Sequence, residues 1–335
     1  MEKKKIHINL PAPFFEHEQL VPKFAKLAEK YEVKKTSYNT HEEIQPDLAW
    51  PDAFIMWSWP KFRDEEFAMA KNLKFQGQIN TTRTTAEAAL KAGVPMSEAR
   101  HCWSPAVSEM ALTLTLAGLR KTSQFHMEMR QGVEPWVEAF PTDIDSQERR
   151  LAGRKVGIVG FGRIGQGIAD LMAPFKVELK AYDPYLPDAV ASSFGATLTS
   201  VEDICANCEI IILCAANTDD AEKVVNASHI NSMRSDAVLV NVGRSMLIDM
   251  DALLKRLEKG ELIAMLDVFD TEPLELDSPF RKLKNAYLTP HRAGGIMESI
   301  TFALDVLILD MEAAFEGKEL KYQVREAALQ CFGES

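Results

Sequence analysis

Short apolar runs recur through the second half of the chain, and most are followed by a turn and then by a helical pattern. Six of these runs predict strands: Val156–Val159, Glu178–Tyr182, Glu209–Cys214, Ala237–Val242, Leu262–Asp267 and Ala286–Leu288. Because helices fit between most of the runs, the pattern predicts a parallel sheet covered by helices on both faces. A last helix is predicted over about Glu298–Phe315, ending near Gly317, and it is long enough to return to the first part of the chain.

The first hundred residues alternate strand and helix patterns and predict a small α/β domain of their own. The predicted strands are Lys5–Leu10, Ala53–Trp57 and Leu73–Gln76, and the predicted helices are His17–Lys30 and Thr85–Ala92. Two domains are therefore the natural interpretation of a chain of 335 residues.

A helix start is predicted at Ser104-Pro105, with Ser104 as the N-cap and Pro105 at the first helical position. The helix runs over Ala106–Leu119 and is mostly apolar all round, which indicates burial between domains or subunits. The segment Gly132–Arg150 is polar, contains two prolines and is interpreted as a connector.

The composition is that of an ordinary globular protein, with 46% hydrophobic and 26% charged residues. A formal net charge of −11 argues against binding to nucleic acid or to an anionic membrane. No apolar run approaches the roughly 18 residues of a membrane span, and the apolar stretch after Lys5 stops at Pro11, which does not fit a secretory signal. Five cysteines, an odd number, give no disulfide framework, so we expect a cytoplasmic protein.

Cys205 and Cys208 form a C-x-x-C pair. Such a pair is found in redox and metal sites, but it also fits two small buried residues where a helix gives way to a strand. Since the sequence has no second C-x-x-C and no nearby Cys/His group, we interpret the pair as packing residues and expect no metal.

A glycine motif of the form G-x-G-x-x-G follows the first strand of the second half. It consists of Gly160, Gly162 and Gly165. The motif lies between the strand Val156–Val159 and the predicted helix Arg163–Met172, which is the context of dinucleotide sites. The helix would offer the N–H groups of Arg163 and Ile164 to a diphosphate.

Asp183 ends the next strand, 23 residues after Gly160. A carboxylate at this spacing can bind the ribose hydroxyls of NAD and would repel the 2′-phosphate of NADP. The alternative is that Asp183 caps a helix or a turn. We expect NAD as the cofactor.

Four polar residues follow later strands at the same edge of the predicted sheet: Arg244, Asp267, Glu272 and His291. An arginine can hold the carboxylate of a 2-keto acid and polarise its carbonyl group, and a histidine can supply the proton. A carboxylate behind the imidazole would fix its tautomer and favour the protonated form. Each residue alone fits an ordinary surface position, but together with the glycine motif they indicate nicotinamide-linked redox chemistry on a small acid.

Residues 151–294 resemble the NAD domain of the D-isomer-specific 2-hydroxyacid dehydrogenases, a family that includes phosphoglycerate, glyoxylate/hydroxypyruvate and D-lactate dehydrogenases. The resemblance rests on four ordered motifs: Leu151–Gly160, Gly243-Arg244 with Ile248-Asp249, Leu266–Phe269 with Glu272-Pro273-Leu274, and Thr289-Pro290-His291. It implies that Arg244 binds the substrate, that His291 is the acid/base group and that Glu272 supports it.

The resemblance also implies a fold and a set of cofactor contacts. The fold is a Rossmann-type doubly wound parallel sheet, residues 105–292, inserted into a smaller flavodoxin-like α/β substrate domain, residues 1–104 plus 293–335. The expected NAD contacts are Gly160, Gly162, Arg163, Ile164, Gly165, Asp183, Ala215, Val242, Asp267 and Gly294. A homodimer built on the helix after Ser104 and D stereochemistry are further expectations.

The segment Gln76–Arg83 departs from the family's glycine-rich substrate loop, because only Gly77 remains. Its expected substrate contacts are Gln78, Ile79 and Asn80. Arg83 could meet a second anionic group, or it could be a surface residue.

The tryptophans Trp57, Trp59 and Trp103 could form an aromatic substrate pocket. Large aromatic side chains mostly bury area, so core packing near the domain junction is the favoured interpretation. A structural role is expected for His101.

The prediction is therefore an NAD-dependent dehydrogenase that interconverts a 2-keto acid and a D-2-hydroxy acid. The alternative is an NAD(H)-sensing binding protein that keeps the fold, as some corepressors that resemble this family do. A formate-type enzyme fits less well, because such enzymes carry Gln where Glu272 stands.

Overall fold

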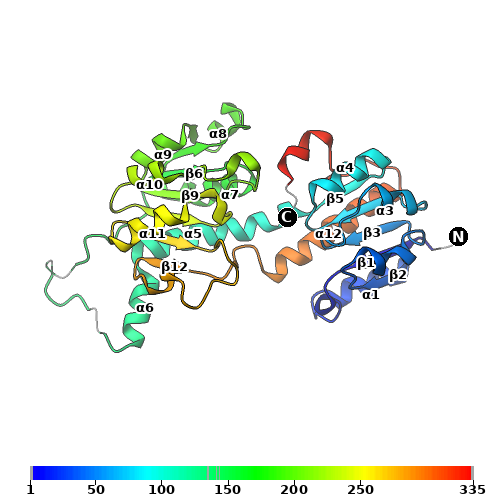
Figure 1. The fold of residues 1–335 in the computed structure, drawn as a ribbon, viewed down its shortest axis with the longest axis horizontal. Coiled ribbons are helices and arrows are strands. Elements are labelled where there is room, and N and C mark those ends of the chain that lie inside the picture. The colour runs from blue at the N-terminus through cyan, green and yellow to red at the C-terminus, as the bar shows by residue number, and fades with distance from the viewer. Residues whose placement is uncertain (1–2, 134–135, 141, 143, 333–335) are drawn as a thin grey trace. The chain divides into compact units, whose positions relative to one another are not determined.

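The computed structural model describes residues 3–133, 136–140, 142 and 144–332. The chain divides into two compact units. One consists of Met1–Trp103 together with Ile296–Ser335, and the other consists of Ser104–Gly295 (Figure 1).

The unit Ser104–Gly295 is built on a seven-stranded sheet in which every pair of neighbours is parallel. In spatial order the strands are β12 (Ala286–Leu288), β11 (Ile263–Leu266), β10 (Val238–Asn241), β9 (Ile210–Leu213), β6 (Lys155–Val159), β7 (Glu178–Tyr182) and β8 (Ala196–Leu198). The strand order reverses between β6 and β9, as in doubly wound dinucleotide-binding folds. All six predicted strands are present, and the short edge strand β8 is an addition to them.

Seven helices accompany this sheet in the described part of the unit. They are α5 (Ser104–Arg120), α6 (Thr122–Arg130), α7 (Arg163–Met172), α8 (Asp188–Ser193), α9 (Val201–Asn207), α10 (Ala227–Ser232) and α11 (Met250–Glu258). The prediction of Ser104 as an N-cap is wrong: Ser104 is the first residue of α5, because a short 3-10 helix, Arg100–Trp103, leads directly into it. Helix α6 was not predicted. Among the described residues, no helix has both the length and the apolarity that crossing a membrane requires.

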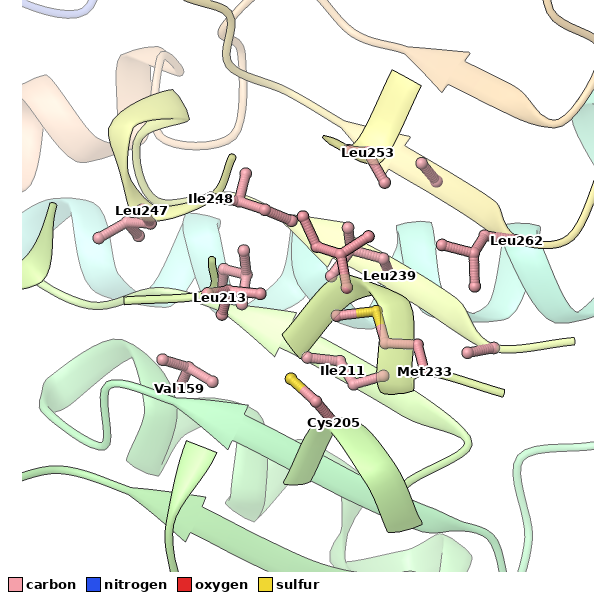
Figure 2. Packing of buried hydrophobic residues seen from close by; sticks show 14 of the residues in the cluster. Val159, Cys205, Ile211, Leu213, Met233, Leu239, Leu247, Ile248, Leu253 and Leu262 are labelled. Carbon is pink, nitrogen blue, oxygen red and sulfur yellow. The ribbon is translucent and has the colours of Figure 1, made fainter. Parts of the chain in front are cut away.

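The core of this unit forms around the central strands β9 and β10, which are buried throughout. Figure 2 shows Ile211, Met233 and Cys205 gathered in this core. Burying side chains of this size stabilises the fold by roughly 1.5–3 kcal/mol each. Burial also raises the pKa of the free thiols of Cys205 to about 12 and of Cys208 to about 11, which fits packing residues rather than a reactive pair.

The other unit contains a five-stranded parallel sheet. In spatial order the strands are β2 (Glu32–Thr36), β1 (Lys5–Asn9), β3 (Ala53–Met56), β4 (Phe75–Gln78) and β5 (Met96–Glu98). The helices are α1 (Val21–Lys30), α2 (His41–Ile44), α3 (Asp64–Met69), α4 (Arg83–Ala92) and α12 (Met297–Phe315) (Figure 1). This is the flavodoxin-like strand order, so the predicted α/β fold with two parallel sheets is confirmed.

Several boundaries in this unit differ from the prediction. The strand predicted at Leu73–Gln76 is β4, two residues later, because its buried side includes Gln76 and Gln78 and their polarity hides the strand. The helix predicted from His17 begins at Val21. The strands β2 and β5 were not predicted, since both are edge strands and carry charged residues that are typical of sheet edges.

Helix α12 closes this unit against β4. A Cβ atom on Gly77 would stand 3.3 Å from Leu307 of α12, so the glycine permits the close approach. The buried carboxylate of Asp310 accepts hydrogen bonds from Ser97 Oγ at 2.6 Å and from the N–H groups of Lys321 and Tyr322 at 2.9 and 2.8 Å. These bonds fix the segment after the helix to the edge of the sheet.

Candidate active site

The glycine turn after β6 requires glycine at two positions. Gly160 has φ +92°, and a Cβ atom there would lie 2.3 Å from Cα of Ala215. A Cβ atom on Gly165 would lie 2.5 Å from the carbonyl oxygen of Gly160. The turn is therefore as tight as a dinucleotide motif requires.

The first turn of α7 forms an open cradle of backbone N–H groups. Gly162 is its N-cap and provides no side-chain hydrogen bond. No atom lies within 4 Å of the place where a Cβ atom on Gly162 would stand. Because the first N–H groups of a helix have no acceptor within it, those of Arg163 and Ile164 suit a diphosphate.

The carboxylate of Asp183 lies beside this turn. One oxygen accepts the N–H of Phe161 at 2.9 Å, and the other accepts the N–H of Tyr185 at 3.0 Å. Each oxygen keeps a lone pair for a further donor. Asp183 is thus held at the end of β7, where the ribose of a dinucleotide is expected.

The side chains of His291 and Glu272 are hydrogen-bonded to each other. Nδ1 of His291 lies 2.6 Å from Oε2 of Glu272, and Oε1 of Glu272 accepts the N–H of Phe269 at 3.0 Å. The imidazole is nearly half exposed, with 45% of its side-chain surface accessible. With Nδ1 engaged, Nε2 is the nitrogen left for a substrate.

Burial is the largest single influence on the pKa of Glu272 and acts to raise it. The hydrogen bonds from His291 and Phe269, together with the charges of His291 and Arg244, outweigh it and hold the pKa below its ordinary value. Glu272 is therefore a carboxylate at neutral pH.

Asp267 organises the segment that carries His291. Its carboxylate is fully buried and accepts hydrogen bonds from Thr289 Oγ1 at 2.5 Å and from the N–H groups of Arg292 and Ala293 at 2.9 and 2.8 Å. The carbonyl oxygen of Asp267 accepts the N–H of His291 at 2.9 Å. These bonds surround His291, whose backbone has φ +51°.

Arg244 follows β10, and the buried Asn241 shapes its turn. The amide of Asn241 donates to the carbonyl of Arg244 at 3.0 Å and accepts the N–H of Gly243 at 3.1 Å. The guanidinium of Arg244 donates to the carbonyl of Gly243 at 2.8 Å. The positive charge of Arg244 is one of the causes that lower the pKa of Glu272. Because Arg244, Glu272 and His291 follow the neighbouring strands β10, β11 and β12, all three stand at the edge of the sheet that carries the glycine turn.

The remaining predicted cofactor contacts lie at the same edge. Ala215 follows β9 and touches the glycine turn, Val242 is buried at the end of β10, and Gly294 follows the segment held by Asp267.

The substrate contacts predicted in the segment Gln76–Arg83 lie in the other unit and are less accessible. Gln78 and Ile79 are fully buried. The side-chain oxygen of Asn80 accepts the indole N–H of Trp103 at 3.0 Å. Arg83 is paired with Glu87 at 2.9 Å on the surface of α4.

With this geometry established, comparison with known families gives a match over residues 112–293 to the D-isomer specific 2-hydroxyacid dehydrogenase, NAD binding domain. The match covers more than half of the 335 residues. The chain belongs to this family. The resemblance predicted from the motifs is thus confirmed, and so is NAD as the cofactor of the matched domain.

The D-3-phosphoglycerate dehydrogenase of Methanocaldococcus jannaschii is 28% identical to this family member over 296 residues, which make up 87% of this chain and 55% of the relative. The chain spans about half the length of the first curated relatives it matches. A solved phosphoglycerate oxidoreductase from Rhizobium etli is 25% identical, with a TM-score of 0.78 over 96% of this chain and 98% of that one. The D-lactate dehydrogenase with NAD+ from Lactobacillus jensenii, 21% identical, has the same fold, with a TM-score of 0.78 over 96% of this chain and 100% of that one.

Two supporting residues of this dehydrogenase family member were not predicted. The side chain of Asn241 bonds to the turn that directly follows it, at the carbonyl of Arg244, and the side chain of Thr289 bonds to the carboxylate of Asp267, 22 residues earlier in the chain. Both stand at the ends of predicted strands, a position that could have drawn attention to them.

Proposed function

We propose that this protein is an NAD-dependent dehydrogenase that interconverts a 2-keto acid and a D-2-hydroxy acid. The observation that carries the proposal is the His291–Glu272 pair, 2.6 Å apart, at the sheet edge where α7 begins without a side-chain cap. An acid/base group and a diphosphate cradle at one edge suit nicotinamide chemistry on a carbonyl group. The D stereochemistry follows from the family alone.

The chemistry divides between the cofactor and three side chains. When bound, NADH supplies a hydride that forms the new C–H bond while the carbonyl π electrons move to oxygen. Nε2 of His291 gives its proton to that oxygen, and the reverse reaction returns the proton to Nε2. Arg244 pairs with the substrate carboxylate and polarises the carbonyl, while Glu272 orients the imidazole through the hydrogen bond at Nδ1.

The cofactor would be held by groups that are already in place. The N–H groups of Arg163 and Ile164 would bind the diphosphate, and Asp183 would accept hydrogen bonds from the ribose hydroxyls. Asp267 was expected to contact NAD; its three hydrogen bonds support the additional role of positioning His291.

We assign NAD binding to the unit Ser104–Gly295 and substrate selection to the unit formed by Met1–Trp103 and Ile296–Ser335. The homodimer and the cytoplasmic location stay predictions from the sequence.

The test is NADH oxidation, followed by absorbance, against a panel of 2-keto acids with NADPH in parallel. The panel contains glyoxylate, hydroxypyruvate, pyruvate, 2-ketoglutarate, phenylpyruvate and branched 2-keto acids. Turnover of one member with a preference for NADH supports the proposal, and chiral analysis of the product tests the D assignment. NADH binding without turnover of any 2-keto acid would contradict it and would favour an NAD(H)-sensing protein.

A further inference from the structure

We infer that the substrate of this reaction carries a bulky apolar side chain and that an aromatic side chain fits best. An aromatic cluster in the unit with the five-stranded sheet binds this side chain. The cluster consists of Phe14, Trp57, Trp59 and Trp103. The inference rests on the proposed function and specifies its substrate class.

The cluster lies where a sheet of this order binds ligands. In the order β2-β1-β3-β4-β5, the connections that follow β1 and β3 run to opposite faces of the sheet. Folds of this kind bind ligands at the carboxyl ends of the two strands where the connections diverge. Phe14 lies in the 3-10 helix Ala12–Phe15 that follows β1. Trp57 and Trp59 directly follow β3. The segments that follow β1 and β3 thus both carry aromatic rings at the carboxyl ends of these strands.

The rings contact one another around Trp57. Its ring centroid lies 5.4 Å from that of Phe14 and 6.1 Å from those of both Trp59 and Trp103. Trp57 and Trp103 pack partly against the core of the unit, whereas Trp59 is 36% exposed. The prediction of core packing therefore fits Trp57 and Trp103 better than Trp59.

The indole N–H of Trp103 is engaged by Asn80, at 3.0 Å. This hydrogen bond joins the segment after β4 to the cluster and fixes the orientation of the Trp103 ring. An aromatic surface whose polar group is already hydrogen-bonded suits an apolar ligand group.

The arginines at the same edge are matched by carboxylates. One arginine follows each of β3, β4 and β5, and each has an acidic partner within 3.2 Å: Arg63 with Glu66, Arg83 with Glu87, and Arg100 with Glu98. A phosphate dianion would have to compete with these carboxylates. The cluster and these ion pairs therefore favour a substrate with an uncharged side chain. They do not favour a phosphate group such as that of 3-phosphoglycerate, after which the phosphoglycerate dehydrogenases are named.

The first experiment measures kcat/KM with NADH for phenylpyruvate, pyruvate and 3-phosphohydroxypyruvate. We expect phenylpyruvate to exceed the other two by at least about tenfold. Trp59→Ala should lower kcat/KM for phenylpyruvate about tenfold more than that for pyruvate, because pyruvate has no bulky side chain for the ring to contact. The matched control Trp136→Ala removes another exposed tryptophan, in the NAD-binding unit, and should change neither value.

The second experiment measures binding rather than turnover. Calorimetry with D-phenyllactate in the presence of NAD+ should give a dissociation constant that Trp59→Ala raises about tenfold and Trp136→Ala leaves unchanged. A preference for 3-phosphohydroxypyruvate or pyruvate, or an equal effect of Trp59→Ala on every substrate, would overturn the inference. If no 2-keto acid reacts, the proposed function fails, and the binding of D-phenyllactate still decides whether the cluster takes an aromatic acid.

Discussion

Nδ1 of His291 lies 2.6 Å from Oε2 of Glu272, and the carbonyl oxygen of Asp267 accepts the N–H of the same histidine at 2.9 Å. Glu272, in the loop after β11, therefore fixes the ring of His291, and Asp267, at the end of β11, fixes its backbone. This leaves Nε2 as the one ring nitrogen that can exchange a proton with a ligand.

Replacing His291 by Ala removes the proposed proton donor without touching the cofactor cradle. We expect kcat to fall by about 10²–10⁴-fold while the dissociation constant of NADH changes by less than about twofold. Steady-state kinetics and NADH fluorescence measure the two quantities separately. A variant that kept its kcat would show that another group supplies the proton.

Glu272→Gln keeps the size of the side chain and removes its charge. The variant keeps a polar group beside Nδ1 of His291 but loses the carboxylate, so kcat should fall by about 10²–10⁴-fold while the dissociation constant of NADH changes by less than about twofold. Steady-state kinetics and an NADH titration measure the two quantities. A kcat equal to that of the native protein would contradict the role of Glu272.

Substitutions at two glycines of the turn should distinguish an effect on folding from an effect on cofactor binding. Gly160→Ala forces an alanine to φ +92° and against Ala215, and should destabilise the NAD-binding unit by about 3 kcal/mol. Gly162→Ala places a methyl group in open space and costs only the poorer N-cap, so stability should fall by about 1 kcal/mol or less. The same methyl group would crowd the diphosphate, and NADH affinity should fall about tenfold, or about 1.4 kcal/mol. Urea unfolding and NADH titration distinguish the two effects, and equal destabilisation by both substitutions would refute this account.

Asp183 should determine the choice between NADH and NADPH. Asp183→Ser removes the charge that repels a 2′-phosphate and weakens the contact to the ribose, so the ratio of kcat/KM for NADH to that for NADPH should fall by at least about tenfold. Asp188→Ser, an exposed acid at the start of the next helix, is the matched control and should leave the ratio unchanged. An unchanged ratio in Asp183→Ser would place the selectivity elsewhere.

His7 should make the smaller sheet unit sensitive to acid. Burial, opposed by the charge of Asp47, lowers the pKa of His7 to about 4 in the folded chain, against an ordinary value of 6.5. The unfolded chain therefore binds more protons between these values, so His7 costs no stability above pH 6.5 and progressively more as the pH falls toward 4. At pH 5 the loss is about 2 kcal/mol.

The measurement is urea unfolding at pH 7 and at pH 5. His7→Gln cannot titrate and should lose about 2 kcal/mol less than the native protein between the two pH values. His126→Gln, which changes an exposed histidine, should keep the native pH dependence. The explanation fails if His7→Gln is as acid-sensitive as the native protein.

The placement of the proposed site groups at one edge of the NAD-binding sheet follows from the sequence, because parallel strands end at one edge and the residues after them meet there. Gly160 and Arg244 follow buried apolar strands, and His291 follows the half-buried apolar strand β12. The supporting roles of Asn241 and Thr289 were missed because a side-chain hydrogen bond, whether to the next turn or to another strand end, leaves no periodic signal in the sequence.

Other features escaped the pattern for different physical reasons. The edge strands β2 and β8 are paired on one side only, so they need no continuous apolar run and resemble loops. In β4, the buried Gln76 and Gln78 broke the apolar run and shifted the predicted strand by two residues.

The sequence by itself determined the two α/β parts, the glycine turn and the order of the chemical groups along the chain, because these depend on local periodicity and on residue type. Only the tertiary structure decided that Nδ1 of His291 pairs with Glu272, that Asp267 holds the His291 segment, and that Trp59 stays exposed while Trp57 packs inward. Distances between segments far apart in the chain depend on how strands and helices pack, and that packing fixes burial and hydrogen-bond partners through contacts that no single stretch of sequence contains.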